Sequence, residues 1–542
     1  MTADLPQGAD PLNSPDTQLP AELAGWPAWT PGEAQLGELE LITSGAFAPL
    51  GGYLSIADLT TVAARGELAD GTPWPVPVTL TVPARAVPDD AGHLVLQDLE
   101  GSPLAVLDIT ERVPVESPGQ PADVLRLAGP VTALRAPEHG PFRGLRRAPA
   151  DVRAELAGRP VLALATRRPL GQRQIGQLRH LAGQLKARIL LLPLVAGPAA
   201  VVKRPEALVR AVLAAGRELP DGTLVVPVPL PPRQNPDEEL AALVVVAAAY
   251  GATHLLADTP AAGRAEPAAD RQGSHPGAGV SRVRSEESAF KKLGVEVLTE
   301  PEWAYDPAFE VWRPLGLIEP GTERGELSGS ELGELLDSGD QVPTWLMPTT
   351  VTTELRRARP PRSARGLVVF FTGLSGSGKS TLARDLRDAL LDRGDRTVSL
   401  LDGDLNRRLL SAGLTFSRED RDLNIARIGY VATEVARHGG IAICAPIAPY
   451  AAARAGVRSM VTEVGDFVLV HVSTPLAECE ARDRKGLYAK ARAGVIGSFT
   501  GISDPYEEPT DADLVIDTSL VSRRDAVAAV LAHLSRGGWL PG

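Results

Sequence analysis

The stretch VVFFTGLSGSGKSTLARDL, from Val368 to Leu386, joins an apolar run, a glycine-rich loop and a helical pattern. Leu367 to Phe371 is apolar and partly β-branched, which predicts a buried strand. From Thr381 to Arg393 leucines recur at helical spacing, which predicts a helix. Strand, loop and helix in this order indicate an α/β nucleotide-binding domain with a parallel sheet.

The loop has the pattern G-x-x-x-x-G-K-S of a phosphate-binding P-loop. Its glycines let the backbone turn N–H groups inward, and the start of the following helix adds positive potential. Lys379 is expected to reach the β- and γ-phosphates, and the Ser380 hydroxyl to ligate Mg²⁺. A chance glycine-rich turn is the alternative, and the order of the flanking elements argues against it. The expected ATP-binding residues are Gly373, Ser375, Gly376, Ser377, Gly378, Lys379, Ser380 and Thr381.

Composition limits the classes of function. At about 150 residues per domain, 542 residues suggest three or four domains. A net charge of −12 disfavours a general nucleic-acid-binding role. The two cysteines, Cys444 and Cys479, lack metal-ligand spacing and fit a reducing cytoplasm. The acidic start is unlike a signal peptide, and the apolar run from Leu240 to Tyr250 is too short to cross a bilayer, so no membrane role is expected.

The chain divides into regions of different pattern. Residues 1–150 read as β-rich, and residues 151–350 alternate strands and helices as in a parallel α/β domain. Within the second region, Pro260 to Ser285 has no periodicity and is predicted to be a loop. Residues 351–365 are basic and proline-bearing, which indicates a solvated linker. Residues 366–542 form the P-loop domain.

Carboxylates follow the next predicted strand of the P-loop domain. Asp402 and Asp404 lie just past its end, where parallel strands line a ligand crevice. They can bind Mg²⁺ or take a proton from an attacking hydroxyl; a plain surface turn is the alternative. Downstream, Phe416, Arg421 and Asn424 suit a second ligand that carries a base and an anion.

Two further stretches complete this domain. Ile441 to Tyr450 is apolar and is predicted to be a buried strand. Ala481 to Pro509 is basic and glycine-hinged, which indicates a lid over phosphates or, alternatively, a solvated basic helix.

Several motifs of the last third agree with one family. LDGDLNRRLL, TFSREDRDLNIARIG, RKGLYAKARAG and FTGISDPYEEP follow GLSGSGKST in this order and resemble adenylyl-sulfate (APS) kinase over residues 366 to about 520. That family transfers the γ-phosphate of ATP to the 3′-hydroxyl of APS and forms 3′-phosphoadenylyl sulfate (PAPS).

The resemblance implies roles for named residues. Asp402 would polarise the 3′-hydroxyl with Asp404 beside it, and Ser380 and Asp402 would hold Mg²⁺. Where the family has a serine, this chain has Ala448, which argues against a phosphoserine intermediate. The implied APS-binding residues are Arg407, Arg421 and Asn424 for the phosphosulfate and ribose, Phe416 and Phe499 around the adenine, Ile447 through its backbone, and Lys485 in the lid.

The first two-thirds of the chain resembles ATP sulfurylase. GAFAPLGGYLSIADL, WPVPVTLTV, GATHLLAD and LSGSELGELLDSGDQVPTWLMP carry the resemblance over residues 20 to 350. It implies a PUA-like N-terminal domain and a Rossmann-like nucleotidylyltransferase domain.

The catalytic motifs of that family are altered here. Its T-R-N-P-x-H-x-x-H motif stands as TRRPLGQRQ, so Gly171 and Gln174 occupy the two histidine positions and Arg168 replaces the asparagine. Its G-R-D-H-A-G loop stands as ADTPAAG, whereas Arg167 and Arg233 remain. Neither glycine nor glutamine supplies a cation for the phosphates. Sulfurylase activity is therefore expected to be absent or very weak.

The sequence thus predicts an APS kinase fused to a degenerate sulfurylase, with ATP and APS as ligands and a cytoplasmic location. Because sulfurylase-type chains commonly assemble, a homo-oligomer is expected. A fully bifunctional PAPS synthetase, a PAPS-sensing regulator and another small-molecule P-loop kinase remain as alternatives. The intact P-loop argues against the regulator, and the lid motifs argue against another kinase.

Overall fold

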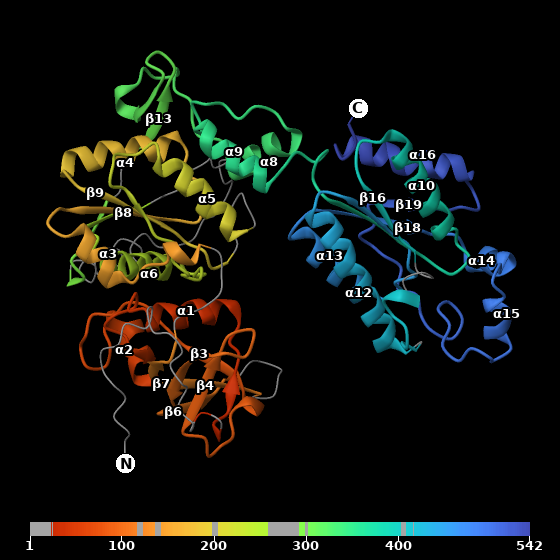
Figure 1. Cartoon of the computed structure of the whole chain (residues 1–542), viewed down its shortest axis with the longest axis horizontal. Helices are drawn as coiled ribbons and strands as arrows, with labels where there is room; N and C mark the ends of the chain where they lie inside the picture. Colours follow the sequence, from red (N-terminus) through yellow and green to blue (C-terminus); the bar gives the residue numbers. More distant parts are fainter. Residues whose placement is uncertain are drawn as a thin grey trace, which may run out of the picture. The chain divides into compact units, whose positions relative to one another are not determined.

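The structure is a computed structural model that describes residue 23 and residues 25–115, 123–135, 142–197, 204–257, 292–298, 302–402, 408–415 and 417–541. The chain forms two compact units (Figure 1), which are treated separately below. The first comprises Met1–Leu332 and Val342–Ala358, and the second Gly333–Gln341 and Arg359–Gly542. The loop predicted from Pro260 to Ser285 lies outside the described residues.

The first unit begins with a seven-stranded, mostly antiparallel sheet, as the β-rich pattern predicts. Its longest strand, β7, pairs with four others. Along β3 buried and partly exposed residues alternate, because successive side chains point to opposite faces of a sheet. Helices α1 and α2, which the sequence pattern did not indicate, accompany the sheet. The elements are β1 (Ala28–Trp29), α1 (Glu33–Thr43), β2 (Gly52–Tyr53), α2 (Ile56–Arg65), β3 (Leu80–Pro83), β4 (His93–Gln97), β5 (Pro103–Asp108), β6 (Glu111–Pro114) and β7 (Val124–Ala133).

A parallel α/β domain follows, as predicted. Its five strands lie in the order β10-β9-β8-β11-β12, and every pairing in the sheet is parallel. All residues of β8 are buried, which is typical of a central strand covered on both faces. The elements are α3 (Pro149–Leu156), β8 (Val161–Thr166), α4 (Gln172–Leu185), β9 (Arg188–Pro193), α5 (Pro205–Gly216), β10 (Leu224–Val225), α6 (Pro236–Ala249), β11 (His254–Leu256) and β12 (Glu296–Leu298).

The end of this unit differs from the predicted linker at residues 351–365. A hairpin of β13 (Trp303–Asp306) and β14 (Val311–Pro314) precedes helix α9 (Thr349–Ala358) in this unit. Helix α8 (Gly329–Ser338) stands between them in the sequence, and its residues from Gly333 onward belong to the second unit. Helix α9 occupies the first half of the predicted linker and packs against α5, with Val351 and Leu355 fully buried. Those two apolar side chains lie on one face of α9 at helical spacing and bury it.

The second unit is a doubly wound parallel sheet in the order β16-β17-β15-β18-β19. Leu367, Val369 and Phe371 of β15 face one hydrophobic cluster, with α10 and α16. Val368 and Phe370 face the other, with α12 and α13 (Figure 1). The elements are β15 (Leu367–Thr372), α10 (Lys379–Arg393), β16 (Val398–Leu401), α12 (Arg418–Arg437), β17 (Ile441–Cys444), α13 (Ala451–Thr462), β18 (Asp466–Val472), α14 (Leu476–Arg482), α15 (Leu487–Arg492), β19 (Leu514–Ile516) and α16 (Arg523–Arg536).

One prediction for this unit needs correction, and another remains a prediction. The strand predicted from Ile441 to Tyr450 ends at Cys444. Beyond it, Pro446 and Pro449 cannot donate to a strand ladder, and Ala448 has a left-handed φ of 46°. The basic segment predicted as a lid contains the last turn of α14 and all of α15.

Arginines of the predicted tether are held within the second unit. Asp337 accepts hydrogen bonds from Arg359, at 2.7 Å to Nε, and from Arg365. Arg365 also pairs with Asp466 at 3.3 Å. The side chain of Arg365 is only 12% exposed, so this part of the predicted solvated linker is instead packed. In the part of the chain that the structure describes, none of the helices combines the length and apolarity that crossing a membrane requires.

Candidate functional site

The P-loop connects β15 to α10 in a backbone conformation that glycine alone adopts easily. Gly373 has a φ of +145°, and a Cβ there would lie 2.4 Å from the carbonyl oxygen of Val472. Gly378 has a φ of +105° and forms the N-cap of α10. Helix α10 therefore begins at Lys379, two residues before the predicted start at Thr381.

Carbonyl groups of the P-loop are bonded on its outer side. The Ser375 carbonyl accepts from the Tyr488 hydroxyl at 2.8 Å. The Ser377 carbonyl accepts from the hydroxyls of Thr474 at 3.1 Å and Thr518 at 2.8 Å. Because these carbonyls point outward, the loop can direct N–H groups to the inside, where they would meet phosphate oxygens.

Lys379 lies inside this loop. Its Nζ donates to the Leu374 carbonyl at 2.6 Å and approaches Ser377 Oγ at 3.4 Å. The pKa of Lys379 is lowered to about 7, mainly by burial; Cys479 opposes this shift and the positive charge of Lys485 adds to it. Two predicted phosphate-binding cations, Lys379 and Lys485, therefore lie close enough to affect each other.

Asp402 follows directly after β16, as predicted, at the carboxyl end of the sheet. Its Oδ2 accepts from the Arg384 guanidinium of α10 at 2.6 Å. Arg384 lies one helical turn after Ser380, so the two share a face of the helix. The hydroxyl of Ser380 and the carboxylate of Asp402 are hard oxygen donors of the kind that Mg²⁺ prefers beside phosphates. Asp404 lies outside the described residues.

The predicted substrate residues of α12 are partly described. Arg421 is 8% exposed and donates to Thr500 Oγ1 at 3.1 Å and to the Ser498 carbonyl at 2.7 Å. Asn424, one turn later, has a buried Oδ1 without a hydrogen-bond partner among the described residues. A buried unsatisfied acceptor of this kind is suited to a ligand donor. Arg407 and Phe416 lie outside the described residues.

Ile447 is tied to the end of β15. Its carbonyl accepts from Thr372 Oγ1 at 2.7 Å and from the Gly373 amide at 3.4 Å. The structure thus brings this predicted backbone contact next to the start of the P-loop. Ala448 beside it is 1% exposed and carries no hydroxyl.

Phe499 packs in a small cluster rather than standing open. It is 8% exposed and meets Tyr488 edge-to-face, with ring centroids 4.9 Å apart. Arg482 donates to Thr518 Oγ1 at 2.8 Å, and Arg492 pairs with Glu480 at 2.9 Å. Two arginines of the predicted lid therefore bond to residues on either side of that segment, whereas Lys485 lies in the connection between α14 and α15.

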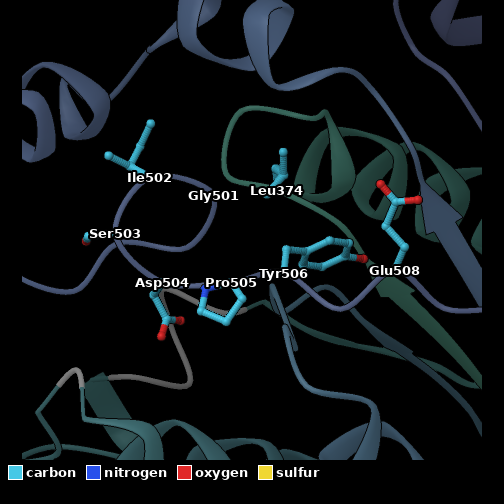
Figure 2. Close-up of a pocket in the computed structure, with 8 residues that line it drawn as sticks. All are labelled: Leu374, Gly501, Ile502, Ser503, Asp504, Pro505, Tyr506 and Glu508. Atoms are coloured by element: carbon cyan, nitrogen blue, oxygen red, sulfur yellow. The ribbon is translucent and has the colours of Figure 1, made fainter.

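A cavity of about 520 Å³ opens beside the P-loop. Figure 2 shows that one segment forms most of its wall, with Leu374 of the P-loop facing that segment. The cavity is lined both by the P-loop and by the segment 501–508, whose Asp504 contacts Arg421. The lining residues are Leu374, Gly501, Ile502, Ser503, Asp504, Pro505, Tyr506 and Glu508.

In the first unit, the altered histidine motif lies between β8 and α4. The Gly171 amide donates to Gln174 Oε1 at 3.0 Å, so Gln174 caps α4. A Cβ at Gly171 would lie 2.9 Å from the Leu346 carbonyl oxygen, which leaves no room for a histidine without a backbone shift. Sequence reasoning identified both positions but not this crowding.

The two arginines of the sulfurylase family that this chain keeps, Arg167 and Arg233, are each paired with a glutamate. Arg167 pairs with Glu239 at 3.1 Å, and Arg233 pairs with Glu38 at 2.6 Å. Arg167 also donates to the Ala196 carbonyl at 2.8 Å, and burial lowers its pKa. Their capacity to bind anions is therefore already used in part. Arg168, at the altered asparagine position, accepts from Thr166 Oγ1 through its carbonyl.

Residues that sequence reasoning missed include Arg384, Tyr488, Asp504 and Thr518. The spacing of Arg384 from Ser380 was a usable signal, because residues four apart share a helix face. Tyr488 and Asp504 stood in quoted motifs without a role. No local pattern indicates that Thr518 contacts the P-loop.

Three family models match this chain. A model described as Adenylylsulphate kinase matches residues 365–517, one described as ATP-sulfurylase matches residues 143–358, and one described as PUA-like domain matches residues 12–123. Together they agree with the three structured regions of the fold.

Similar proteins span the whole chain. A protein of Phaeosphaeria nodorum named "Sulfate adenylyltransferase" is 34% identical over 96% of both chains. One of the same name from Mycosarcoma maydis is 33% identical, over 93% of this chain and 92% of the relative. The solved structure titled "Hexameric APS kinase from Thiobacillus denitrificans" is 34% identical with a TM-score of 0.77, over 96% of this chain and 95% of that one.

Proposed function

The chain belongs to the sulfate adenylyltransferase family, with PUA-like, ATP-sulfurylase and adenylylsulfate kinase domains fused, and we propose that it transfers the γ-phosphate of ATP to the 3′-hydroxyl of APS. The family places the chain in sulfate activation. In the proposed reaction, the O3′–Pγ bond forms, the bond between Pγ and the β–γ bridging oxygen breaks, and ADP and PAPS leave.

The observation that carries the proposal is the P-loop, whose Ser375 and Ser377 carbonyls accept hydrogen bonds from other segments while Lys379 lies buried inside the loop. Amides and the N-terminus of α10 would hold the ATP phosphates. Lys379 and Lys485 would balance the charge that spreads over the transferred phosphoryl group. Phosphoryl transfer needs positioning and electrostatic stabilisation rather than a covalent protein intermediate, which agrees with an alanine at position 448.

Asp402 is the proposed acceptor of the 3′-hydroxyl proton. Its place at the carboxyl end of β16 is where ligands of parallel sheets bind. Ser380 and Asp402 would hold Mg²⁺, which would supply positive charge to offset that of the ATP phosphates. On the other side, Arg421 and Asn424 would contact APS. The roles of Asp404, Arg407 and Phe416 remain predictions.

An assay of ADP release with ATP and APS tests the kinase. Lys379→Ala should lower kcat/KM by at least about a hundredfold, because one well-placed cation contributes several kcal/mol to the transition state. Arg387→Ala is the matched control on α10 and should keep wild-type activity, because Arg387 pairs with the neighbouring Asp388 at 2.6 Å and not with a predicted site residue. Equal activity in wild type and Lys379→Ala would remove the assignment.

We further propose that the sulfurylase reaction is absent or very weak. Three features support this: the crowding at Gly171, the use of Gln174 as a helix cap, and the pairing of Arg167 and Arg233 with glutamates. No cation remains at the two altered histidine positions to stabilise charge on the ATP phosphates.

The names of the fungal relatives favour the alternative, a bifunctional PAPS synthetase. The two are separated by measuring pyrophosphate release from ATP and sulfate with purified protein. Turnover comparable to the kinase rate would establish the bifunctional enzyme and overturn the proposed loss. A PAPS-sensing regulator would instead bind nucleotide without turning over ATP and APS.

We also propose a homo-oligomer, because the relative from Thiobacillus denitrificans, which matches over nearly its whole length, is titled hexameric. Light scattering coupled to size-exclusion chromatography tests this against a mass of 57.0 kDa per chain. A cytoplasmic location stays a prediction; both cysteines are free and buried.

A further inference from the structure

One carboxylate links three segments around the proposed APS pocket. We propose that Asp504 is a positioning residue that orients Arg421 toward the phosphosulfate of APS, an inference that rests on the proposed kinase function. Asp504 lines the cavity beside the P-loop (Figure 2). It lies 83 residues from Arg421 along the chain.

The contacts of Arg421 fix the plane of its guanidinium. Nη1 bonds to Asp504 Oδ2 and to Thr500 Oγ1, the latter at 3.1 Å, while Nη2 donates to the Ser498 carbonyl at 2.7 Å. The side chain of Arg421 is 10% exposed and that of Asp504 is 20% exposed. Asp504 is the charged partner in this set, and the other two partners are neutral.

Asp504 is itself held from a third segment. The Tyr450 hydroxyl donates to Asp504 Oδ2 at 2.9 Å and to Oδ1 at 3.1 Å. Burial raises the pKa of Tyr450, and the hydrogen bond to Asp504 raises it further, so the phenol remains a donor at neutral pH. Tyr450 precedes α13 and follows the loop that carries Ile447.

The backbone around Asp504 is also constrained. Its amide donates to the Phe499 carbonyl at 3.1 Å, and its carbonyl accepts from the Gly501 amide at 2.8 Å. The carboxylate is therefore presented by a closed turn rather than by an extended loop. A carboxylate held in this way can fix an arginine before the ligand arrives.

The physical effect is preorganisation. A guanidinium is a planar fork with five N–H donors, so two occupied nitrogens leave a defined direction for the remaining donors. Without Asp504, Arg421 would have to be ordered when the ligand binds, and each side chain immobilised on binding costs affinity. Because Asn424 lies one turn away on α12, the same ordered face would present both groups to APS.

Titration calorimetry with APS, and separately with a non-hydrolysable ATP analogue, tests the proposal. Asp504→Asn keeps the size of the side chain and removes its charge. We expect the Kd for APS to rise about tenfold while the Kd for the ATP analogue changes less than twofold. The matched control is Asp511→Asn, an exposed carboxylate of the same unit that pairs with Arg458 at 3.2 Å, and it should change neither Kd.

A double-mutant cycle separates positioning from a structural role. If Asp504 acts through Arg421, then Asp504→Asn should change the APS Kd less than twofold when Arg421→Ala is already present. A tenfold further loss in that background would refute the proposal, as would an unchanged Kd for Asp504→Asn alone or an equal loss for both nucleotides. If the wild-type protein bound no APS, the proposed kinase function would fail instead.

Should Asp504→Asn not fold, Tyr450→Phe provides the same comparison, because it removes only the hydroxyl that donates to the Asp504 carboxylate. We expect a two- to threefold rise in the Kd for APS alone. No change in that Kd would overturn the positioning role.

Discussion

The buried position of Lys379 in the P-loop predicts that ATP binding takes up a proton. Lys379 is buried against the Leu374 carbonyl, and its pKa is lowered from 10.5 to about 7. Bound phosphates would place several negative charges beside the ammonium and return its pKa toward or above the ordinary value. The experiment therefore varies the pH and measures the number of protons taken up for each ATP bound.

The magnitude follows from these two pKa values. With a pKa of about 7, Lys379 is about 90% neutral at pH 8 and about 50% neutral at pH 7. If the bound state is fully charged, ATP binding takes up about 0.9 proton at pH 8 and about 0.5 at pH 7. The affinity for ATP should therefore fall about fivefold from pH 7 to 8 and about ninefold from pH 8 to 9.

Calorimetry in two buffers of different ionisation enthalpy measures this uptake directly, because the buffer supplies the proton. At pH 8 the phosphates of ATP are themselves deprotonated, so the lysine dominates the signal. Lys379→Met is the control: it should bind ATP weakly, at ligand concentrations chosen to saturate it, with an uptake near zero. An uptake below about 0.2 proton in the wild type at pH 8 would refute the reasoning.

The same group affects stability in a defined direction. Because the folded pKa lies below the unfolded value of 10.5, the unfolded chain binds more protons between about pH 7 and 10.5. The contribution of Lys379 to the free energy of unfolding therefore rises with pH across this window, and its penalty is complete below pH 7. In urea titrations, Lys379→Met should gain stability over the wild type near pH 6 and lose that advantage by pH 10.

Three other outcomes are expected. Arg384→Ala removes the guanidinium from Asp402 and should lower the Mg²⁺ concentration for half-maximal turnover by up to about fivefold, because such a pair contributes about 1 kcal/mol or less. The control Arg387→Ala should leave that concentration unchanged. No difference between the two variants would contradict the idea that Arg384 competes with the metal for Asp402. Gly366→Ala would place a Cβ 1.8 Å from the Ala436 carbonyl oxygen and should lower the free energy of unfolding in urea by about 3 kcal/mol or more. Gly456→Ala in α13 has no atom within 4 Å of the new Cβ and should raise that free energy by about 0.5–1 kcal/mol. Equal effects of the two variants would count against the described packing around Gly366. Both cysteines are fully buried and should react with a thiol reagent only after unfolding, so rapid labelling of the native protein would show that the described packing is wrong.

Local patterns predicted much of the second unit. The strand, loop and helix of the P-loop depend on neighbouring residues, so their order could be predicted from the sequence alone. The predicted start of α10 was two residues too late, because the left-handed conformation of Gly378 lets Lys379 be the first helical residue. The prediction that the strand continues through Ile447 was wrong, because apolar composition alone does not show where prolines interrupt the hydrogen bonds between strands.

The rest depends on contacts between distant residues. Nothing near Arg421 in the chain indicates that Asp504 is its partner, and nothing near Gly171 indicates that Leu346 lies against it. Likewise, the basic charge of Arg365 suggested solvent exposure, because its buried partners Asp337 and Asp466 stand elsewhere in the sequence. Charge patterns report the type of interaction a residue can make but not its location.

The arginines that converge on Asp337 bear on how this protein could be dissected. A fragment begun at Arg359 would contain the whole P-loop domain by sequence but would omit the carboxylate that Arg359 and Arg365 use. Losing Asp337 would leave Arg365 with Asp466 as its remaining carboxylate partner and remove the carboxylate that Arg359 uses, which should lower the stability of the domain. The domain boundary suggested by motif matching therefore leaves out contacts that stabilise the P-loop domain, and expression trials should begin upstream of α8.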